Sequence, residues 1–262
     1  MFEPLVHTLS ITAIAIWVYM TLWFLVSVMT RRNDVADIAW GPGFIVVSIT
    51  SLLISRNVFP STLLVLALVT IWGLRLGLHI GARNIHKSED SRYQIKRRLW
   101  GNQFYLRSYF QIFILQGALI LLVASPIIIL NTFAASNFNW LIVIGAVLWI
   151  IGFSYESLAD RQLSNFISDP SHKGRVMQSG LWRYSRHPNY FGELTQWWAI
   201  GVIVLSSAYG WLGLIGPLLI SYLIIKVSGI PLLEKKYADN LEYQAYKLHT
   251  RALLPLPASR YN

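Results

Sequence analysis

A series of long apolar runs separated by shorter polar segments is the feature of this sequence that most limits its fold. A helix needs about 20 apolar residues to cross a bilayer. The sequence predicts a membrane-spanning helix in each of seven runs: Leu5–Met29, Ile38–Ser55, Ser61–Ile80, Tyr109–Leu130, Asn139–Leu158, Tyr190–Ser207 and Trp211–Ile230. We therefore expect an all-α polytopic membrane protein in which residues 1–262 form a single membrane-embedded domain.

The composition supports this class. Hydrophobic residues make up 55% of the 262 residues and charged residues only 13%. The chain has no cysteine, which excludes disulfides and thiol chemistry. No basic segment precedes the first apolar run, and this run is long enough to span, so no cleaved signal peptide is expected.

The distribution of lysine and arginine predicts the orientation. Of the 22 basic residues, 20 lie in the first, third and fifth loops and in the segment from Lys226 to the C-terminus; Arg56 and Arg75 are the others. Cytoplasmic loops carry the excess of basic residues in membrane proteins. The N-terminus is therefore expected outside and the C-terminus in the cytoplasm, and the net charge of +10 does not require a nucleic-acid partner.

Polar side chains of several predicted spans gather at the same, cytoplasmic end. Polar groups within membrane helices are costly and usually functional. We expect one polar chamber open to the cytosol, lined by spans two, three, five, six and seven. Its candidate residues are Asp37, Arg75, His79, Glu156, Asp160, Asn189, Glu193, Lys226 and Glu234.

One stretch of fourteen residues, 180–193, concentrates this chemistry immediately before the sixth run. It reads Gly-Leu-Trp-Arg-Tyr-Ser-Arg-His-Pro-Asn-Tyr-Phe-Gly-Glu. Pro188 suits the first turn of a helix, and arginines near a helix start suit an anion such as a phosphate. The alternative interpretation is an interfacial anchor of Trp, Tyr and Arg. Asn189 and Glu193 favour a functional site, because neither residue is typical of such anchors.

The run Arg186-His-Pro-Asn-Tyr-Phe-Gly-Glu193, with Asp37-Ile-Ala-Trp-Gly-Pro-Gly-Phe44, resembles the steroid 5-alpha-reductase family, in particular its bacterial branch. Sterol C14 and C7 reductases and isoprenylcysteine carboxyl methyltransferases share the first motif. The resemblance implies a bacterial cytoplasmic-membrane enzyme whose active site faces the cytoplasm. It implies catalytic roles for Asp37 and Glu193, and it places His79 or Trp72 near the position where relatives have a tyrosine.

The resemblance also implies NADPH as the cofactor. Residues that match the family's cofactor contacts are Arg75, Arg83, Glu156, Asp160, Arg175, Asn189, Glu193 and Arg251. We add further candidates from the basic loops and their aromatic neighbours: Tyr93, Arg183, Arg186, His187, Tyr190 and Tyr246. Arginines bind phosphate groups bidentately, and NADPH carries several. The sequence contains no Gly-x-Gly-x-x-Gly or Walker motif and no metal-ligand spacing.

The function that this resemblance implies is reduction of a conjugated enone, with hydride passing from NADPH to the carbon beta to the carbonyl. A 3-oxo-Δ4 steroid is the family's model substrate, and an apolar steroid-like substrate is expected to enter from the bilayer. Two alternatives remain. One is an S-adenosylmethionine-dependent methyltransferase of the isoprenylcysteine type, and the other is a non-enzymatic lipid-binding membrane protein. The proton donor, hydride stereochemistry and oligomeric state stay open.

Overall fold

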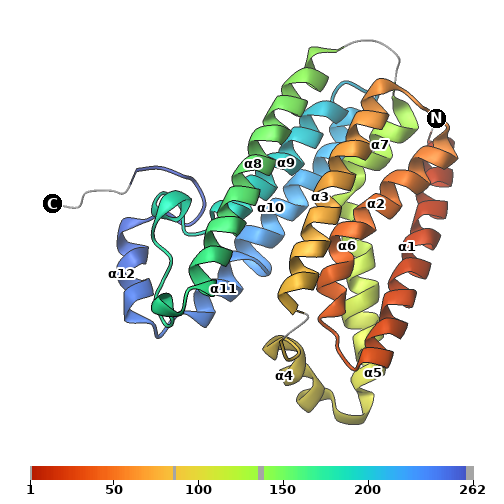
Figure 1. Ribbon diagram of the computed structural model, residues 1–262. Coiled ribbons are helices and arrows are strands. Elements are labelled where there is room, and N and C mark those ends of the chain that lie inside the picture. Colours follow the sequence, from red (N-terminus) through yellow and green to blue (C-terminus); the bar gives the residue numbers. More distant parts are fainter. Residues whose placement is uncertain (1, 85–86, 135–138, 258–262) are drawn as a thin grey trace. The chain divides into compact units, whose positions relative to one another are not determined.

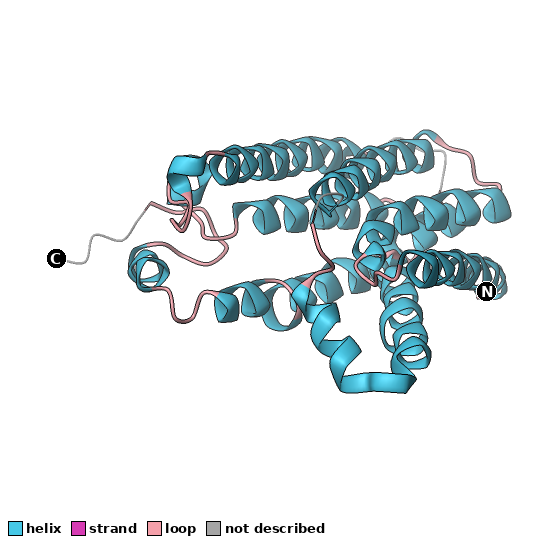
Figure 2. Cartoon of the chain, turned by 60° about the horizontal axis from the view of Figure 1, so that its bottom comes forward, coloured by secondary structure: helices cyan, strands magenta, loops and turns pink. Residues whose placement is uncertain are grey.

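The computed structural model describes residues 2–84, 87–134 and 139–257, which contain helices, turns and loops and no strand (Figures 1 and 2). Within this part of the chain, the prediction of an all-helical protein is confirmed. Contacts divide the chain into two compact units, Met1–Asn139 with Val204–Gly216 and Trp140–Ile203 with Pro217–Asn262. The two units are described separately below.

Helices long and apolar enough to cross a membrane indicate an integral membrane protein. Among the described residues, 6 candidates meet this criterion: Glu3–Thr30, Val35–Ser55, Pro60–Asn84, Ser91–Val123, Trp140–Ser168 and Gly210–Lys236. The remaining predicted span coincides with α9, Pro188–Val204, an apolar helix of 17 residues. A count of seven spans and their orientation therefore stay predictions.

The first unit contains a helical bundle. Its elements are α1 (Glu3–Thr30), α2 (Val35–Ser55), α3 (Pro60–Asn84), α4 (Ser91–Trp100), η1 (Gly101–Gln103), α5 (Phe104–Ser108), η2 (Tyr109–Ile114), α6 (Leu115–Val123), α7 (Ser125–Phe133) and η5 (Gly210–Leu214). Helices α2 and α3 approach each other closely at Gly41 and Gly73, where a Cβ atom on Gly41 would lie 2.6 Å from the Gly73 carbonyl oxygen. Phe44 and Trp72 pack edge to face, with ring centroids 5.5 Å apart.

The second unit is built on α8 (Trp140–Ser168) and most of α9. Its other elements are η3 (Pro170–His172), η4 (Gly180–Arg183), most of α10 (Ile215–Tyr222), η6 (Leu223–Val227), α11 (Ile230–Lys236) and α12 (Leu241–His249). Helices α8 and α9 cross at two glycines: a Cβ atom on Gly192 would lie 2.6 Å from the Gly152 carbonyl oxygen. This crossing brings Glu156 and Gln196 side by side.

Candidate functional site

Asp37, in the first turn of α2, is held by two residues of α4. The Tyr93 hydroxyl donates a hydrogen bond to Asp37 Oδ1 at 2.7 Å, and Arg92 Nη2 donates to Oδ2 at 2.8 Å. Tyr93 is buried, whereas the Asp37 side chain is 23% exposed. The structure thus pairs a partly accessible carboxylate with a tyrosine hydroxyl and a guanidinium. Tyr93, expected from sequence as a cofactor contact, is thus a tyrosine bonded to Asp37, whereas the sequence offered only Trp72 or His79 as neighbours of this carboxylate.

A buried polar network fixes the position of α4. Glu89, just before α4, accepts hydrogen bonds from the Asn33 backbone N–H (2.7 Å) and from Arg97 Nη2 (3.1 Å). The Asn33 side chain accepts from Ser27 at 2.6 Å and donates to Ser108 at 2.7 Å. Asn33, Ser27 and Ser108 are fully buried or nearly so. These bonds join α1, the α1–α2 turn, α4 and α5, and so hold Tyr93 and Arg92 in place.

The other predicted site residues of this unit lie on α3. Arg75, His79 and Arg83 are spaced four residues apart and therefore follow one side of the helix. Arg75 and His79 are half-buried, and Arg83 is exposed. Their predicted catalytic and cofactor roles stay predictions.

In the second unit, Arg186 lies at the centre of a buried ion-pair cluster. Its Nε and Nη2 atoms both donate to Glu234 Oε1 on α11, and Nη1 donates to the Thr250 carbonyl. Lys247 Nζ on α12 contacts the second oxygen of Glu234 at 2.8 Å. Arg186 is 8% exposed and the Glu234 side chain 16% exposed. Arg186 therefore joins the predicted motif to α11 and α12; its cofactor role stays a prediction.

The segment after α12 pairs with the motif through its backbone. The N–H groups of Arg186 and His187 donate to the carbonyls of Arg251 (2.9 Å) and Ala252 (3.0 Å), and Leu256 N–H donates to the Tyr184 carbonyl (3.2 Å). The buried Ser185 hydroxyl adds a bond to the Leu253 carbonyl at 2.9 Å. Residues 184–187 and 251–256 are thus joined by backbone hydrogen bonds. The Arg251 side chain is exposed.

Two aromatic residues, Trp182 and Tyr246, hold η4 in place. Trp182 Nε1 donates to the Ala159 carbonyl of α8 at 3.1 Å, and the Tyr246 hydroxyl donates to the Trp182 carbonyl. Burial raises the pKa of Tyr246 above its usual range, so this hydroxyl stays protonated. Gly180 has φ +61°, a left-handed conformation, and a Cβ atom there would lie 2.6 Å from Gln162 Oε1. Glycine at the start of the motif thus meets a conformational and a steric requirement.

His187 is buried directly before α9. Its Nε2 atom is 3.7 Å from Glu234 Oε1, and its ring stacks on Tyr190 with centroids 5.6 Å apart. Burial lowers the pKa of His187 from 6.5 to about 4, although the nearby Glu234 carboxylate opposes this shift. His187 is therefore neutral at physiological pH.

Helix α8 carries two buried carboxylates, and the first of them contacts α9. Glu156 is 3% exposed and accepts a hydrogen bond of 2.5 Å from Gln196 Nε2, and Asp160 lies one turn further along α8 at 9% exposure. Asn189, Tyr190 and Glu193 occupy the first two turns of α9 and are half-buried. The second unit therefore brings two buried carboxylates of α8 and the polar start of α9 onto two helices that cross closely.

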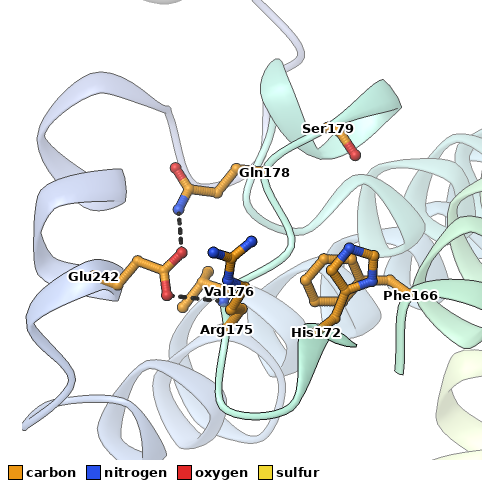
Figure 3. A pocket seen from close by; sticks show the side chains of 7 residues that line it. All are labelled: Phe166, His172, Arg175, Val176, Gln178, Ser179 and Glu242. Atoms are coloured by element: carbon orange, nitrogen blue, oxygen red, sulfur yellow. Dashed lines mark hydrogen bonds between the residues drawn. The ribbon is translucent and has the colours of Figure 1, made fainter. Parts of the chain in front are cut away.

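An open pocket of about 630 Å³ lies near the end of α8 (Figure 3). Its lining residues are Phe166, His172, Arg175, Val176, Gln178, Ser179 and Glu242. The rings of Phe166 and His172 stack with centroids 4.2 Å apart. Glu242 is held by the Val176 N–H and by Gln178 Nε2, both at 3.1 Å. Arg175, a predicted phosphate contact, thus lines a pocket with an aromatic wall and an acidic wall, while Arg183 is exposed.

Several residues that shape these sites did not stand out in the sequence. Arg92 precedes Tyr93 directly, but nothing local indicates that both reach Asp37, 55 and 56 residues away. Gln196 is an amide within the apolar run of α9, and this was a usable signal. Glu234 was expected in a polar chamber, and the structure gives its partners as Arg186 and Lys247. That chamber would draw on both units and stays a prediction.

Within the described ranges, no group of three histidine, aspartate or glutamate side chains could hold a metal ion.

Comparisons with known proteins place the chain in a family. It is 28% identical over 227 residues to an uncharacterized protein of Schizosaccharomyces pombe, and the match covers 73% of this chain and 65% of that relative. The chain thus spans less than two thirds of the relative's length. No solved structure matches it. The model of the family described as "Protein of unknown function (DUF1295)" matches residues 23–250, and the chain belongs to this family.

Proposed function

We propose that this protein is an NADPH-dependent reductase of a conjugated enone in a steroid or steroid-like lipid, with its site at the cytoplasmic face of a bacterial inner membrane. One observation carries the proposal. The Tyr93 hydroxyl and the Asp37 carboxylate are 2.7 Å apart at one end of an apolar helix, and Arg92 binds the same carboxylate. Such a group suits general-acid chemistry on an apolar carbonyl substrate.

The proposed role of Tyr93 is to bind the carbonyl oxygen of the enone. A hydroxyl that now donates to Asp37 turns toward the substrate oxygen and stabilises the negative charge that develops there. NADPH, when bound, supplies the hydride that reaches the beta carbon. Asp37 orients the tyrosine and relays a proton from the cytosolic side. This proton adds to the alpha carbon of the enolate and gives the saturated ketone.

The second unit has donors that suit a dinucleotide phosphate. Arg175, Gln178 and Ser179 supply a guanidinium, an amide and a hydroxyl to one open pocket, and the Phe166–His172 stack supplies an aromatic wall. The Glu242 carboxylate repels an anion in the same pocket, but two hydrogen bonds, from the Val176 N–H and Gln178 Nε2, partly offset its charge. The donor set therefore fits the phosphate-bearing adenosine end of NADPH. Asn189 and Glu193 are proposed to hold the nicotinamide carboxamide.

The test is Tyr93→Phe, which removes the hydroxyl and keeps the ring. If Tyr93 binds the substrate carbonyl rather than the cofactor, the purified variant should bind NADPH as the unsubstituted protein does, because the cofactor donors proposed above belong to the second unit. Its single-turnover oxidation of NADPH with a 3-oxo-Δ4 steroid should fall about 100-fold or more, the usual contribution of a general acid. Absorbance of the reduced nicotinamide follows the reaction.

Tyr105→Phe is the matched control, because Tyr105 belongs to the same unit and is exposed. An unchanged rate in Tyr93→Phe would remove this hydroxyl from the chemistry. Retention of S-adenosylmethionine without NADPH would instead favour the methyltransferase alternative. Binding of lipid with neither nucleotide would favour the non-enzymatic one.

A further inference from the structure

Helix α4 has an inner face and an outer face of different chemistry. The inner face carries Tyr93 and Arg97, which bind Asp37 and Glu89, and the Arg97 guanidinium also lies 4.0 Å from the Phe104 ring centroid. The outer face carries Ile95 and Leu99, which are 57% and 75% exposed. These two residues are four apart and lie over each other on the helix.

Basic residues flank this apolar pair on both sides. Because successive helical residues turn by about 100°, Arg98 lies on one side of the pair and Lys96 on the other. Arg98 is exposed, and the Lys96 ammonium lies 5.6 Å from the ring centroids of both Tyr93 and Trp100. The sequence of α4, SRYQIKRRLW, contains no acidic residue. Apolar residues bordered by cations are typical of helices that lie in the interface of an anionic membrane.

The chain places this helix next to the bilayer. Helix α3 ends at Asn84, shortly before α4, and η1 and α5 lead from α4 into η2 and α6, within the candidate span Ser91–Val123. Figure 1 shows α4 beyond the ends of α1, α2 and α3 in its own unit. The exposed apolar pair of α4 thus lies at the end of membrane-spanning helices, at the level of the lipid headgroups.

We propose that the outer face of α4 docks on the anionic phospholipid headgroups of the cytoplasmic leaflet and thereby keeps Tyr93 against Asp37. Ile95 and Leu99 enter the acyl boundary, while Arg98 and Lys96 bind lipid phosphates. The docking itself does not depend on the proposed function. Only the effect of docking on activity, through the Tyr93–Asp37 pair, rests on that function. The activity would then depend on the charge of the membrane.

The absence of cysteine allows a direct test. A fluorophore on Leu99→Cys should be quenched by lipids brominated in the acyl chain, in nanodiscs of phosphatidylcholine with phosphatidylglycerol. Quenching should decrease in phosphatidylcholine alone and at high salt. A fluorophore on the exposed Ser171→Cys of the second unit should show no such quenching. Equal, weak quenching at both positions would overturn the proposal.

Charge reversal tests the basic residues. Arg98→Glu in the Leu99→Cys background should remove the gain in quenching that phosphatidylglycerol gives, whereas Lys236→Glu, an exposed change on α11, should preserve it. Amides of α4 should also exchange hydrogen more slowly in discs with phosphatidylglycerol. Neither measurement uses NADPH or a substrate, so failure of the reductase proposal leaves the docking result intact. An Arg98→Glu variant that keeps the full lipid dependence would contradict the proposal.

Discussion

At the scale of single residues, the buried ion pairs determine which cations remain available to a ligand. Arg186 directs three nitrogen atoms at Glu234 and the Thr250 carbonyl, and Lys247 takes the other Glu234 oxygen. Arg186 is buried but Glu234 is partly exposed, so removing one partner costs less than about 3–5 kcal/mol, the cost for a fully buried pair. The Arg186 guanidinium therefore joins the motif to α11 and α12. Arg175 and Arg183 are exposed and remain available to a ligand.

His187 predicts a dependence of stability on pH. Its pKa is lowered from 6.5 to about 4 by burial, so between these values the unfolded chain binds a proton that the folded chain does not. Stability should therefore fall as pH drops from about 6.5 toward 4, by about 2–3 kcal/mol in all. Glu234, Arg186 and Lys247 are the charged groups around this ring. Thermal unfolding of the detergent-solubilised protein at stepped pH measures the effect.

His187→Gln is the control for this prediction, because glutamine is neutral at every pH in the window. The variant should lose most of the slope between pH 6.5 and 4, leaving the part due to carboxylates. An unchanged slope would assign the acid sensitivity to Glu234 and its partners.

The sequence identified the chemical character of these residues but not their partners. Asp37, Glu156, Arg186 and His187 stood out because polar groups near apolar runs are costly. Their partners are separated by long stretches of chain: Glu234 is 48 residues from Arg186, and Gln196 is 40 from Glu156. Only the packing of distant helices sets such pairs, and a single sequence contains no record of that packing.

At the scale of helices, close crossings at glycines set the positions of the polar groups. Gly192 and Gly152 let α8 and α9 approach until a Cβ atom on Gly192 would lie 2.5 Å from the Glu156 backbone nitrogen. Backbone atoms cannot move aside as a flexible side chain can. The contact between Glu156 and Gln196 depends on this approach.

Gly192→Ala should therefore destabilise the protein by about 1–3 kcal/mol or more, the usual cost of an overpacked contact. Gly81→Ala, near the end of α3, is the matched control, because its Cβ atom would meet only Ile38 Cδ1 at 4.0 Å. Alanine there should be neutral or stabilising by up to about 1 kcal/mol. Thermal unfolding measures the stability of both variants. Equal changes in stability would show that the α8–α9 crossing can relax around an added methyl group.

Helix boundaries were predictable where apolar runs were long. The expected spans Leu5–Met29 and Ser61–Ile80 lie within α1 and α3. The run Tyr109–Leu130 is broken at Ala124, where Pro126 opens α7. Helix α4 lies in the third loop of the predicted topology, because its sequence is too short and too cationic to predict a span. Its N-cap was a missed signal, since the Asp90 side chain accepts a bond from the Arg92 N–H.

At the scale of the whole molecule, the distribution of basic residues leads to a topological prediction. With seven spans and a cytoplasmic C-terminus, the α2–α3 connection lies outside and α12 inside. Val58 and Ala245 are exposed residues of these two segments. On intact cells, a membrane-impermeant maleimide should label Val58→Cys, and it should label Ala245→Cys only after permeabilisation. The cysteine-free chain supplies the blank, and labelling of Ala245→Cys on intact cells would reverse the orientation.

The pairing of residues 184–187 with residues 251–256 has a consequence for biosynthesis. Chains emerge from the ribosome N-terminal end first, and spanning helices enter the membrane in that order. The Arg186-His187 segment is therefore synthesised about 65 residues before Arg251 and Ala252, whose carbonyls accept its N–H groups. A ribosome that stalls before residue 251 therefore leaves inserted helices whose Arg186 and His187 N–H groups lack these carbonyl partners.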